Sequence, residues 1–229
     1  MQLTAPCAVR RSRPMPRAGP APGYATNVFI NCPFDAEYQP LFHAITFAVI
    51  HCGYTVRCAL ETEDTGATRI EKIYALIEAC QFGIHDISRI ERDALNDLPR
   101  FNMPFELGVF LGATRFGLRN QRNKRCLVLE AERYRYQKFL SDIAGQDIRH
   151  HDNDPARAVG AVRDWLASAR PKTAKPLPGA TAIMKHYQEF EHNLPAILGA
   201  ADLEAAELGF FDRANLMAQF LQARTALAG

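Results

Sequence analysis

Between Asn27 and Trp165, short apolar runs alternate with longer segments in which apolar residues recur at helical spacing. This alternation constrains the fold strongly, because strands that are joined through a helix usually run parallel in one sheet. We therefore expect an α/β fold, namely a flavodoxin-like open parallel five-stranded sheet with helices on both faces. The predicted strands are residues 28–30, 54–60, 82–87, 125–129 and 147–150.

Apolar residues at helical spacing predict the helices between these strands. In the first helix Leu41, Ile45 and Val49 share one face, and Gly53 marks the end of the helix. Four further helices are expected: one that includes Ile70, Ile73, Tyr74 and Ile77 on its apolar face, one that ends near Gly117, one at 134–143, and one from an Asp154 N-cap through Trp165.

The chain divides into four predicted parts. Residues 1–25 are rich in proline and arginine, lack acidic residues and predict a disordered tail. Residues 26–170 form the α/β domain, and the proline-containing segment 171–179 is a linker. Residues 180–229 predict two helices, the second behind an Asp212 cap. Fifty residues make a thin core alone. We therefore expect this tail to pack on the α/β domain, on a second copy or on a partner protein.

Composition excludes several classes of protein. No apolar run approaches the roughly 18 residues of a membrane span. The six cysteines show no CxxC spacing and predict buried free thiols, which indicates the cytoplasm. Without the four arginines of the N-terminal tail, the chain has 23 basic and 25 acidic residues. The body of the chain therefore gives no electrostatic case for nucleic acid.

Candidate ligand-binding residues follow the first three predicted strands. Open parallel sheets bind ligands at the carboxyl ends of their strands. The loop that follows strand one could cradle a phosphate with its backbone amides, or could be an ordinary turn in which Asp35 caps the next helix. Its residues are Asn31, Cys32, Pro33, Phe34 and Asp35.

The next two strands offer polar residues at the same edge. Asp86 and Ser88 end strand three and could contact ribose hydroxyls or cap a loop. Glu61 follows strand two and could bind a ligand or form an ion pair with Arg57. Arg69 opens the second helix, where it could meet a phosphate.

A single carboxylate, Glu106, lies near the start of an otherwise apolar helix. Asn102 and Pro104 are helix-start signals, which places Glu106 in the first turn. An acid there could simply complement the helix dipole, or it could act chemically while the dipole keeps it ionised. Gly108 and Gly112 lie one turn apart and predict close packing of this helix on its neighbour.

Other catalytic motifs are missing from the sequence. GxGxxG, GxxxxGK[ST] and GxSxG do not occur, so a dinucleotide fingerprint, a P-loop and a nucleophile elbow are not supported. The seven histidines show no ligand spacing with a third partner, so we predict no metal site. We also predict no cofactor, with NAD a candidate substrate.

The segment Arg100-x-Asn102-x-x-x-Glu106-Leu107-Gly108-x-Phe110-x-Gly112 resembles the signature of bacterial TIR-like predicted nucleotide-binding domains. That group includes NAD-cleaving effectors of antiphage systems. The run 28–34 and the aspartate that ends strand three also resemble the nucleoside 2-deoxyribosyltransferase group, which has a related flavodoxin-like fold. The resemblance covers roughly residues 27–168.

In both groups a helix-borne glutamate is catalytic, so the resemblance implies this role for Glu106. An ionised carboxylate stabilises the positive charge that builds on a sugar as its N-glycosidic bond breaks. We therefore expect a cytoplasmic enzyme that cleaves NAD or a related nucleotide. The expected nucleotide pocket contains Asn31, Pro33, Phe34, Asp35, Glu61, Asp86 and Ser88, with Arg100 and Asn102 positioning Glu106 or a phosphate.

Two alternatives remain at this point. The chain could bind a nucleotide without cleaving it, as a sensor or an interaction module. It could also exchange nucleobases, as the deoxyribosyltransferases do. An open pocket beside Glu106 would favour an enzyme, whereas a Glu106 that is locked to an arginine without a cavity would favour a sensor.

Overall fold

The computed structural model describes residues 20–61, 66–89 and 101–227. One sheet holds five parallel strands in the order β2-β1-β3-β4-β5, which confirms the predicted flavodoxin-like architecture. Successive strands are added in opposite directions on either side of β1, so the topological switch point lies between β1 and β3. The strands are β1 Asn27–Asn31, β2 Thr55–Cys58, β3 Phe82–Asp86, β4 Arg125–Glu130 and β5 Arg149–His150.

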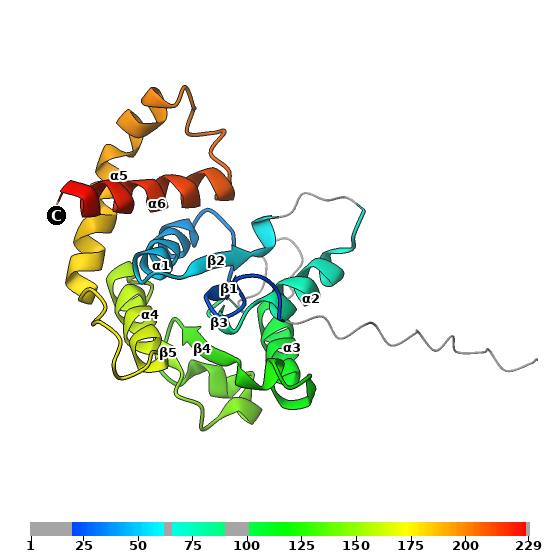
Figure 1. The fold of residues 1–229 in the computed structure, drawn as a ribbon. Coiled ribbons are helices and arrows are strands. Elements are labelled where there is room, and N and C mark those ends of the chain that lie inside the picture. The colour runs from blue at the N-terminus through cyan, green and yellow to red at the C-terminus, as the bar shows by residue number, and fades with distance from the viewer. Residues whose placement is uncertain (1–19, 62–65, 90–100, 228–229) are drawn as a thin grey trace, which may run out of the picture.

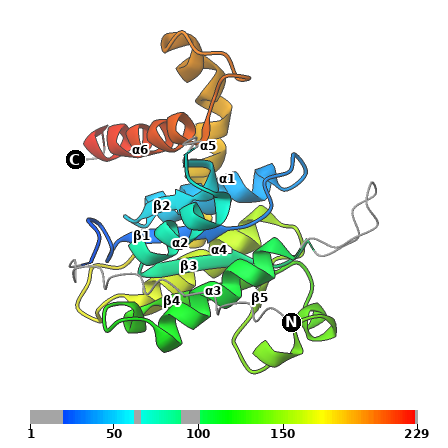
Figure 2. The ribbon, with the colours of Figure 1, turned by 90° about the vertical axis from the view of Figure 1, so that its right-hand side faces the viewer.

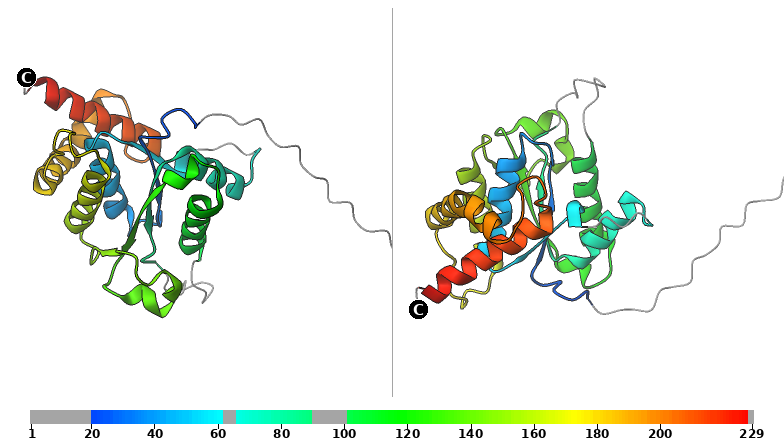
Figure 3. Two further views of the ribbon diagram at one scale, coloured as in Figure 1. Left: turned by 60° about the horizontal axis from the view of Figure 1, so that its bottom comes forward. Right: turned by 90° about the horizontal axis from the view of Figure 1, so that it is seen from above.

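Helices cover both faces of the sheet (Figure 1 and Figure 3). Helix α1, Gln39–His51, packs beside α4, Pro155–Ala169, on one face. Helix α2, Arg69–Ala79, packs beside α3, Asn102–Phe116, on the other. Strand β1 lies inside this sandwich and all five of its residues are buried. Its near-continuous apolar sequence is typical of a strand that is covered on both faces.

The two C-terminal helices pack on the outer side of the α1–α4 layer (Figure 2). Helix α5, Ala180–Ala200, contacts α1 and α4, and helix α6, Phe210–Leu227, contacts α1. One face of α5 is buried and shares one hydrophobic cluster with the sheet; it consists of Ile183, Tyr187, Phe190, Leu194 and Leu198. Asp212 lies within the first turn of α6 and not at the cap. Association of these helices with a second copy or a partner protein stays a prediction.

The helix predicted at 134–143 is wrong. Two short 3-10 helices, Arg135–Lys138 and Ser141–Ile143, occupy this segment. Tyr134 begins it in the left-handed conformation with φ 64°, and Leu140 leaves helical geometry with φ −141°. The broken path still places Tyr136 in a small core cluster, so the apolar spacing reflected burial and not a continuous helix.

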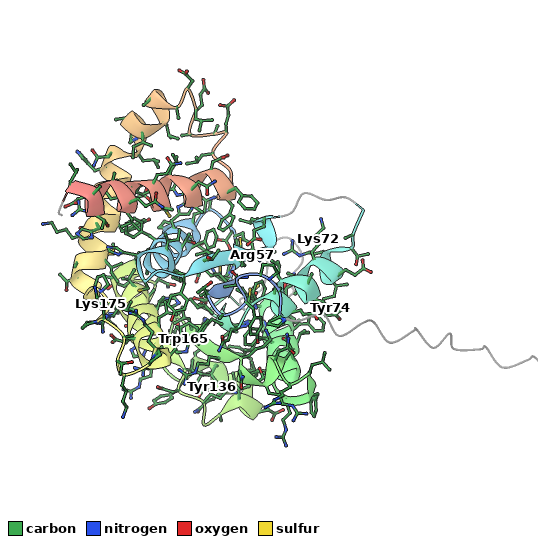
Figure 4. All side chains as sticks on the ribbon, in the orientation of Figure 1. Arg57, Lys72, Tyr74, Tyr136, Trp165 and Lys175 are labelled. Carbon is green, nitrogen blue, oxygen red and sulfur yellow. The ribbon has the colours of Figure 1, made fainter. Side chains whose placement is uncertain are left out.

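The second strand and second helix differ in detail from the prediction. Strand β2 stops at Cys58 because the Cys58 amide donates to the Glu61 carboxylate over 2.8 Å, which starts a 3-10 turn at 59–61. Tyr74 was predicted on the apolar face of α2, but its side chain is 48% exposed and points away from the sheet (Figure 4). The buried face of α2 consists of Ile73, Leu76 and Ile77.

The close packing of α3 on the sheet comes from the strand and not from the helix. A Cβ atom at Gly108 or Gly112 would meet nothing within 4 Å, so the prediction for these glycines is wrong. A Cβ atom at Gly83 of β3, by contrast, would lie 2.7 Å from the ring of Phe110. Gly83 therefore lets α3 approach the sheet through Phe110.

Three other expectations concern the N-terminal tail, the cysteines and membrane-spanning segments. Residues 1–19 of the predicted tail lie outside the described residues, whereas 20–25 form a turn in which Tyr24 is buried. Of the described cysteines, all are free thiols, and only Cys126 is not fully buried. Within the described segments, none of the helices has the length and apolar character to cross a membrane.

Candidate functional site

A cavity of about 340 Å³ opens at the carboxyl end of β1. The loop after β1 forms one wall, and the first turns of α2 and α3 form the others. Chain segments that are far apart in the sequence therefore meet at the switch point, where this fold class binds its ligands. Six predicted site residues line the cavity, namely Asn31, Pro33, Phe34, Asp35, Asn102 and Glu106, together with Cys32, Arg69 and Met103.

Glu106 lies on the buried stripe of α3. The helix begins at Asn102 after a Phe101 cap, so Glu106 is its fifth residue and lies in the second turn, not in the first as predicted. Its buried face consists of Met103, Glu106, Leu107 and Phe110, a spacing that places this carboxylate among core positions. Glu106 is only 7% exposed, and within the described residues no hydrogen bond or ion pair holds its carboxylate.

Burial raises the pKa of Glu106 to about 7, and the charge of Arg69 opposes this rise. The expectation that the helix dipole keeps this carboxylate fully ionised is therefore wrong. The dipole acts mainly within the first turn, and Glu106 lies beyond it. Loss of water around a carboxylate favours its neutral form, and here this effect dominates. At neutral pH the protonated and ionised forms of Glu106 are both populated.

Arg69 supplies a positive charge at the cavity wall. It is the first residue of α2, which begins in a capping box between Thr68 and Glu71. The Arg69 side chain is exposed, and no described acidic side chain forms an ion pair with it. The capping box fixes where α2 starts and so places Arg69 at the rim of the cavity, where its exposed guanidinium can meet an anion.

Asn31 is tied to two neighbours by its amide nitrogen. Nδ2 donates to the backbone carbonyl of Met103 over 3.0 Å and lies 3.0 Å from Nδ1 of His85. Asn31 and His85 are register partners on β1 and β3. Asn31, the last residue of β1, is thereby hydrogen-bonded to the first turn of α3, the helix that carries Glu106.

Asp86 does not line the Glu106 cavity. It is fully buried and accepts hydrogen bonds from the Tyr38 hydroxyl, from Ser88, and from His151 Nε2 over 2.9 Å. Burial by itself would raise the pKa of Asp86, but the bonds from His151, Ser88 and Tyr38 outweigh it and lower this pKa. Asp86 therefore joins β3 to α1 and to the segment after β5.

Ser88 lies in a second cavity of about 410 Å³ at the same edge of the sheet. This cavity is lined by residues from the start of α1, the ends of β3 and β4 and the start of α4, including Tyr38, Arg89 and Arg135. The Asp35 carboxylate accepts a hydrogen bond from Arg89 over 3.1 Å in an ion pair, so Asp35 of the first cavity is joined to Arg89 of the second.

Two further predicted residues are not part of the Glu106 cavity. Glu61 forms an ion pair with Arg57 over 2.7 Å, and its side chain is almost completely buried. This is the ion pair that the sequence allowed as the alternative to ligand binding. Arg100 lies outside the described residues. Within the described part of the chain, no group of three or more His, Cys, Asp or Glu side chains is arranged to hold a metal ion.

Two histidines were not predicted to belong to this edge of the sheet. His85 carried only the signal of a histidine inside an apolar strand, which is typical of a core residue. His151 follows the shortest strand, and its partner Asp86 lies 65 residues away. Only the register of the sheet brings these side chains to their partners.

Comparison with protein-family models, curated proteins and solved structures finds no match to this chain.

Proposed function

We propose that this protein cleaves the N-glycosidic bond of NAD or a related nucleotide, with Glu106 as the catalytic residue. The observation that carries the proposal is a nearly buried carboxylate, without a partner among the described residues, beside an open cavity. A buried acid costs stability unless it is paired, so its presence on a core stripe of α3 favours a chemical role. The sequence resemblance to TIR-like nucleotide-binding domains supports the same role.

The chemistry needs one carboxylate beneath the sugar. As the bond between C1′ of the ribose and the nitrogen of the base breaks, its electron pair leaves with the base. For NAD the leaving group is neutral nicotinamide, so no acid has to protonate it. Positive charge builds on the sugar ring, and ionised Glu106, whose side chain is largely shielded from solvent, stabilises this charge. Water then adds to C1′ and releases one proton, which leaves ADP-ribose.

The other cavity residues suit a nucleotide. Arg69 at the rim would bind a phosphate, since a guanidinium matches phosphate oxygens in charge and geometry. Asn102 begins α3, and its backbone amide belongs to the first turn, whose free N–H groups favour anions. The wall residues Asn31 and Asp35 offer polar atoms for sugar hydroxyls.

The decisive test compares the wild type with Glu106→Gln. Concentrated protein is incubated with NAD, and nicotinamide is measured by chromatography. We expect Glu106→Gln to lose turnover by about 10²-fold or more, because the amide cannot balance the charge on the sugar. NAD binding, followed by calorimetry, should persist, since the amide has nearly the same shape as the carboxyl group.

A Glu106→Gln variant with wild-type turnover would overturn the proposal. NAD that binds to the wild type without release of nicotinamide would favour the sensor. Release only in the presence of a free acceptor nucleobase would favour base exchange over hydrolysis.

A further inference from the structure

The amide of Asn31 has one orientation. The Met103 carbonyl can only accept, so the Asn31 atom that lies 3.0 Å from it must be the amide nitrogen. The same nitrogen lies 3.0 Å from Nδ1 of His85, which must therefore accept and carry no proton. Both N–H groups of the Asn31 side chain are committed within the protein.

His85 is suited to keep this arrangement. The ring is fully buried, with edge contacts to the rings of Phe29 and Phe110 at centroid distances of 5.8 and 4.9 Å. Burial, assisted by the charge of Lys124, lowers the pKa of His85 to about 3. The imidazole is therefore neutral at physiological pH, and Nδ1 stays an acceptor. Among the described residues Nε2 has no hydrogen-bond partner.

These bonds leave the Asn31 carbonyl oxygen for a ligand. Asn31 lines the Glu106 cavity, and no described residue donates to its Oδ1 atom. Because a turned amide would point its oxygen at the Met103 carbonyl and lose that bond, the cavity presents a fixed acceptor at this point. A fixed acceptor selects ligands that carry a donor there and rejects ligands that lack one.

We propose that Asn31, held by His85, accepts a hydrogen bond from a ribose hydroxyl and so selects substrates whose sugar carries that hydroxyl. The inference rests on the proposed function and specifies the sugar of its substrate. Hydroxyls are the donors nearest to the anomeric carbon of an N-ribosyl compound, and Glu106 shares the cavity with Asn31. The bond to Met103 gives Asn31 a second task, since it positions the turn of α3 that precedes Glu106.

The test uses calorimetry with the Glu106→Gln protein, so that ligands are bound but not consumed. The two probes are NAD and its analogue with a 2′,3′-dideoxyribose on the nicotinamide side. We expect NAD to bind about tenfold more tightly than the analogue, the effect of one or two lost hydrogen bonds to a neutral acceptor. This comparison needs no change at Asn31, so a variant that fails to fold does not prevent it.

Variants in the same Glu106→Gln background then show which residues cause the preference for NAD over the analogue. Asn31→Ala should reduce the preference for NAD to about twofold, and His85→Phe should reduce it in part. The double variant should lose no more than Asn31→Ala, because His85 acts through Asn31. The matched control is Asn27→Ala at the other end of β1. Asn27 is equally buried and its amide donates to the Ala79 carbonyl over 3.0 Å, but it does not line the cavity.

The outcomes separate this inference from the proposed function. If NAD does not bind the Glu106→Gln protein, the proposed function fails and this inference fails with it. If NAD binds but no better than the analogue, only this inference is overturned. A loss of preference in Asn27→Ala equal to that in Asn31→Ala would also overturn it, because the effect would then reflect stability alone.

Discussion

At the scale of single residues, Glu106 links the stability of the fold to the ionisation of the site. Its pKa is raised by burial to about 7 from an ordinary value of 4.5. Between these values the folded protein holds a proton on Glu106 that the unfolded chain has released. The contribution of Glu106 to the free energy of unfolding must therefore fall as pH rises through this window, because at this residue the folded state binds more protons.

The prediction compares the free energy of unfolding of the wild type and Glu106→Gln at pH 5 and pH 8 by urea titration. The glutamine has no charge to bury, so the variant should gain stability relative to the wild type between these pH values. The gain is about 2–3 kcal/mol, from about 1.4 kcal/mol per unit of pKa shift. A difference between the two proteins that stays constant with pH would show that Glu106 is ionised with an ordinary pKa.

At the scale of elements, a glycine of β3 and a glycine of α3 should respond to the same substitution with opposite sign, because only the β3 glycine lies against the other element. Gly83→Ala places a methyl group 2.7 Å from the Phe110 ring, so β3 and α3 must move apart. We expect a loss of about 1–3 kcal/mol in the free energy of unfolding, as for other overpacked cores. Gly108→Ala meets nothing within 4 Å and adds a helix-favouring residue, for a gain of about 0.5–1 kcal/mol. Chemical denaturation measures both, and equal signs would contradict the packing of α3.

A second prediction concerns the hydrogen bonds that join β3 to its neighbours through Asp86. Asp86→Ala removes the acceptor shared by Tyr38, Ser88 and His151, and it leaves their polar atoms buried without a partner. The expected loss in the free energy of unfolding is about 3–5 kcal/mol.

Asp147→Ala is the matched control for this loss. It breaks an exposed ion pair with Arg149 and should cost less than about 1 kcal/mol in urea unfolding. Similar losses for both variants would mean that the hydrogen bonds of Asp86 at the end of β3 do not stabilise the fold.

The secondary-structure elements differ in how well the sequence predicts them. Periodicity within a segment predicted the sheet class and the helices α1, α4 and α5, since burial along one element repeats in its own sequence. It failed at 134–143, where helical spacing occurs without a helix. Glu106 and the loop after β1 could be found from their places at strand and helix ends. The bonds from Asn31 to His85 and from His151 to Asp86 could not, because they depend on register between distant strands.

At the scale of the whole molecule, one hydrophobic cluster joins the α/β domain to the C-terminal helices. Phe190 of α5 is fully buried between Phe47 of α1 and Phe220 of α6, with ring centroids 5.9 and 5.6 Å away. The same cluster continues through α1 to the sheet, where the ring of Trp165 of α4 contacts the ring of Phe82 of β3. A core that is shared in this way should unfold as one unit.

The substitution Phe190→Ala tests whether the α/β domain and the C-terminal helices unfold together. Removal of a fully buried phenylalanine should lower the free energy of unfolding by about 3–5 kcal/mol. Trp165 is the only tryptophan of the chain, so its fluorescence reports on the α4–sheet contact, whereas far-ultraviolet circular dichroism reports on all helices. In a shared core the two signals shift together to lower urea concentration. A midpoint from Trp165 that stays at the wild-type value while the helical signal shifts would show that α5 and α6 fold separately from the domain that carries Glu106.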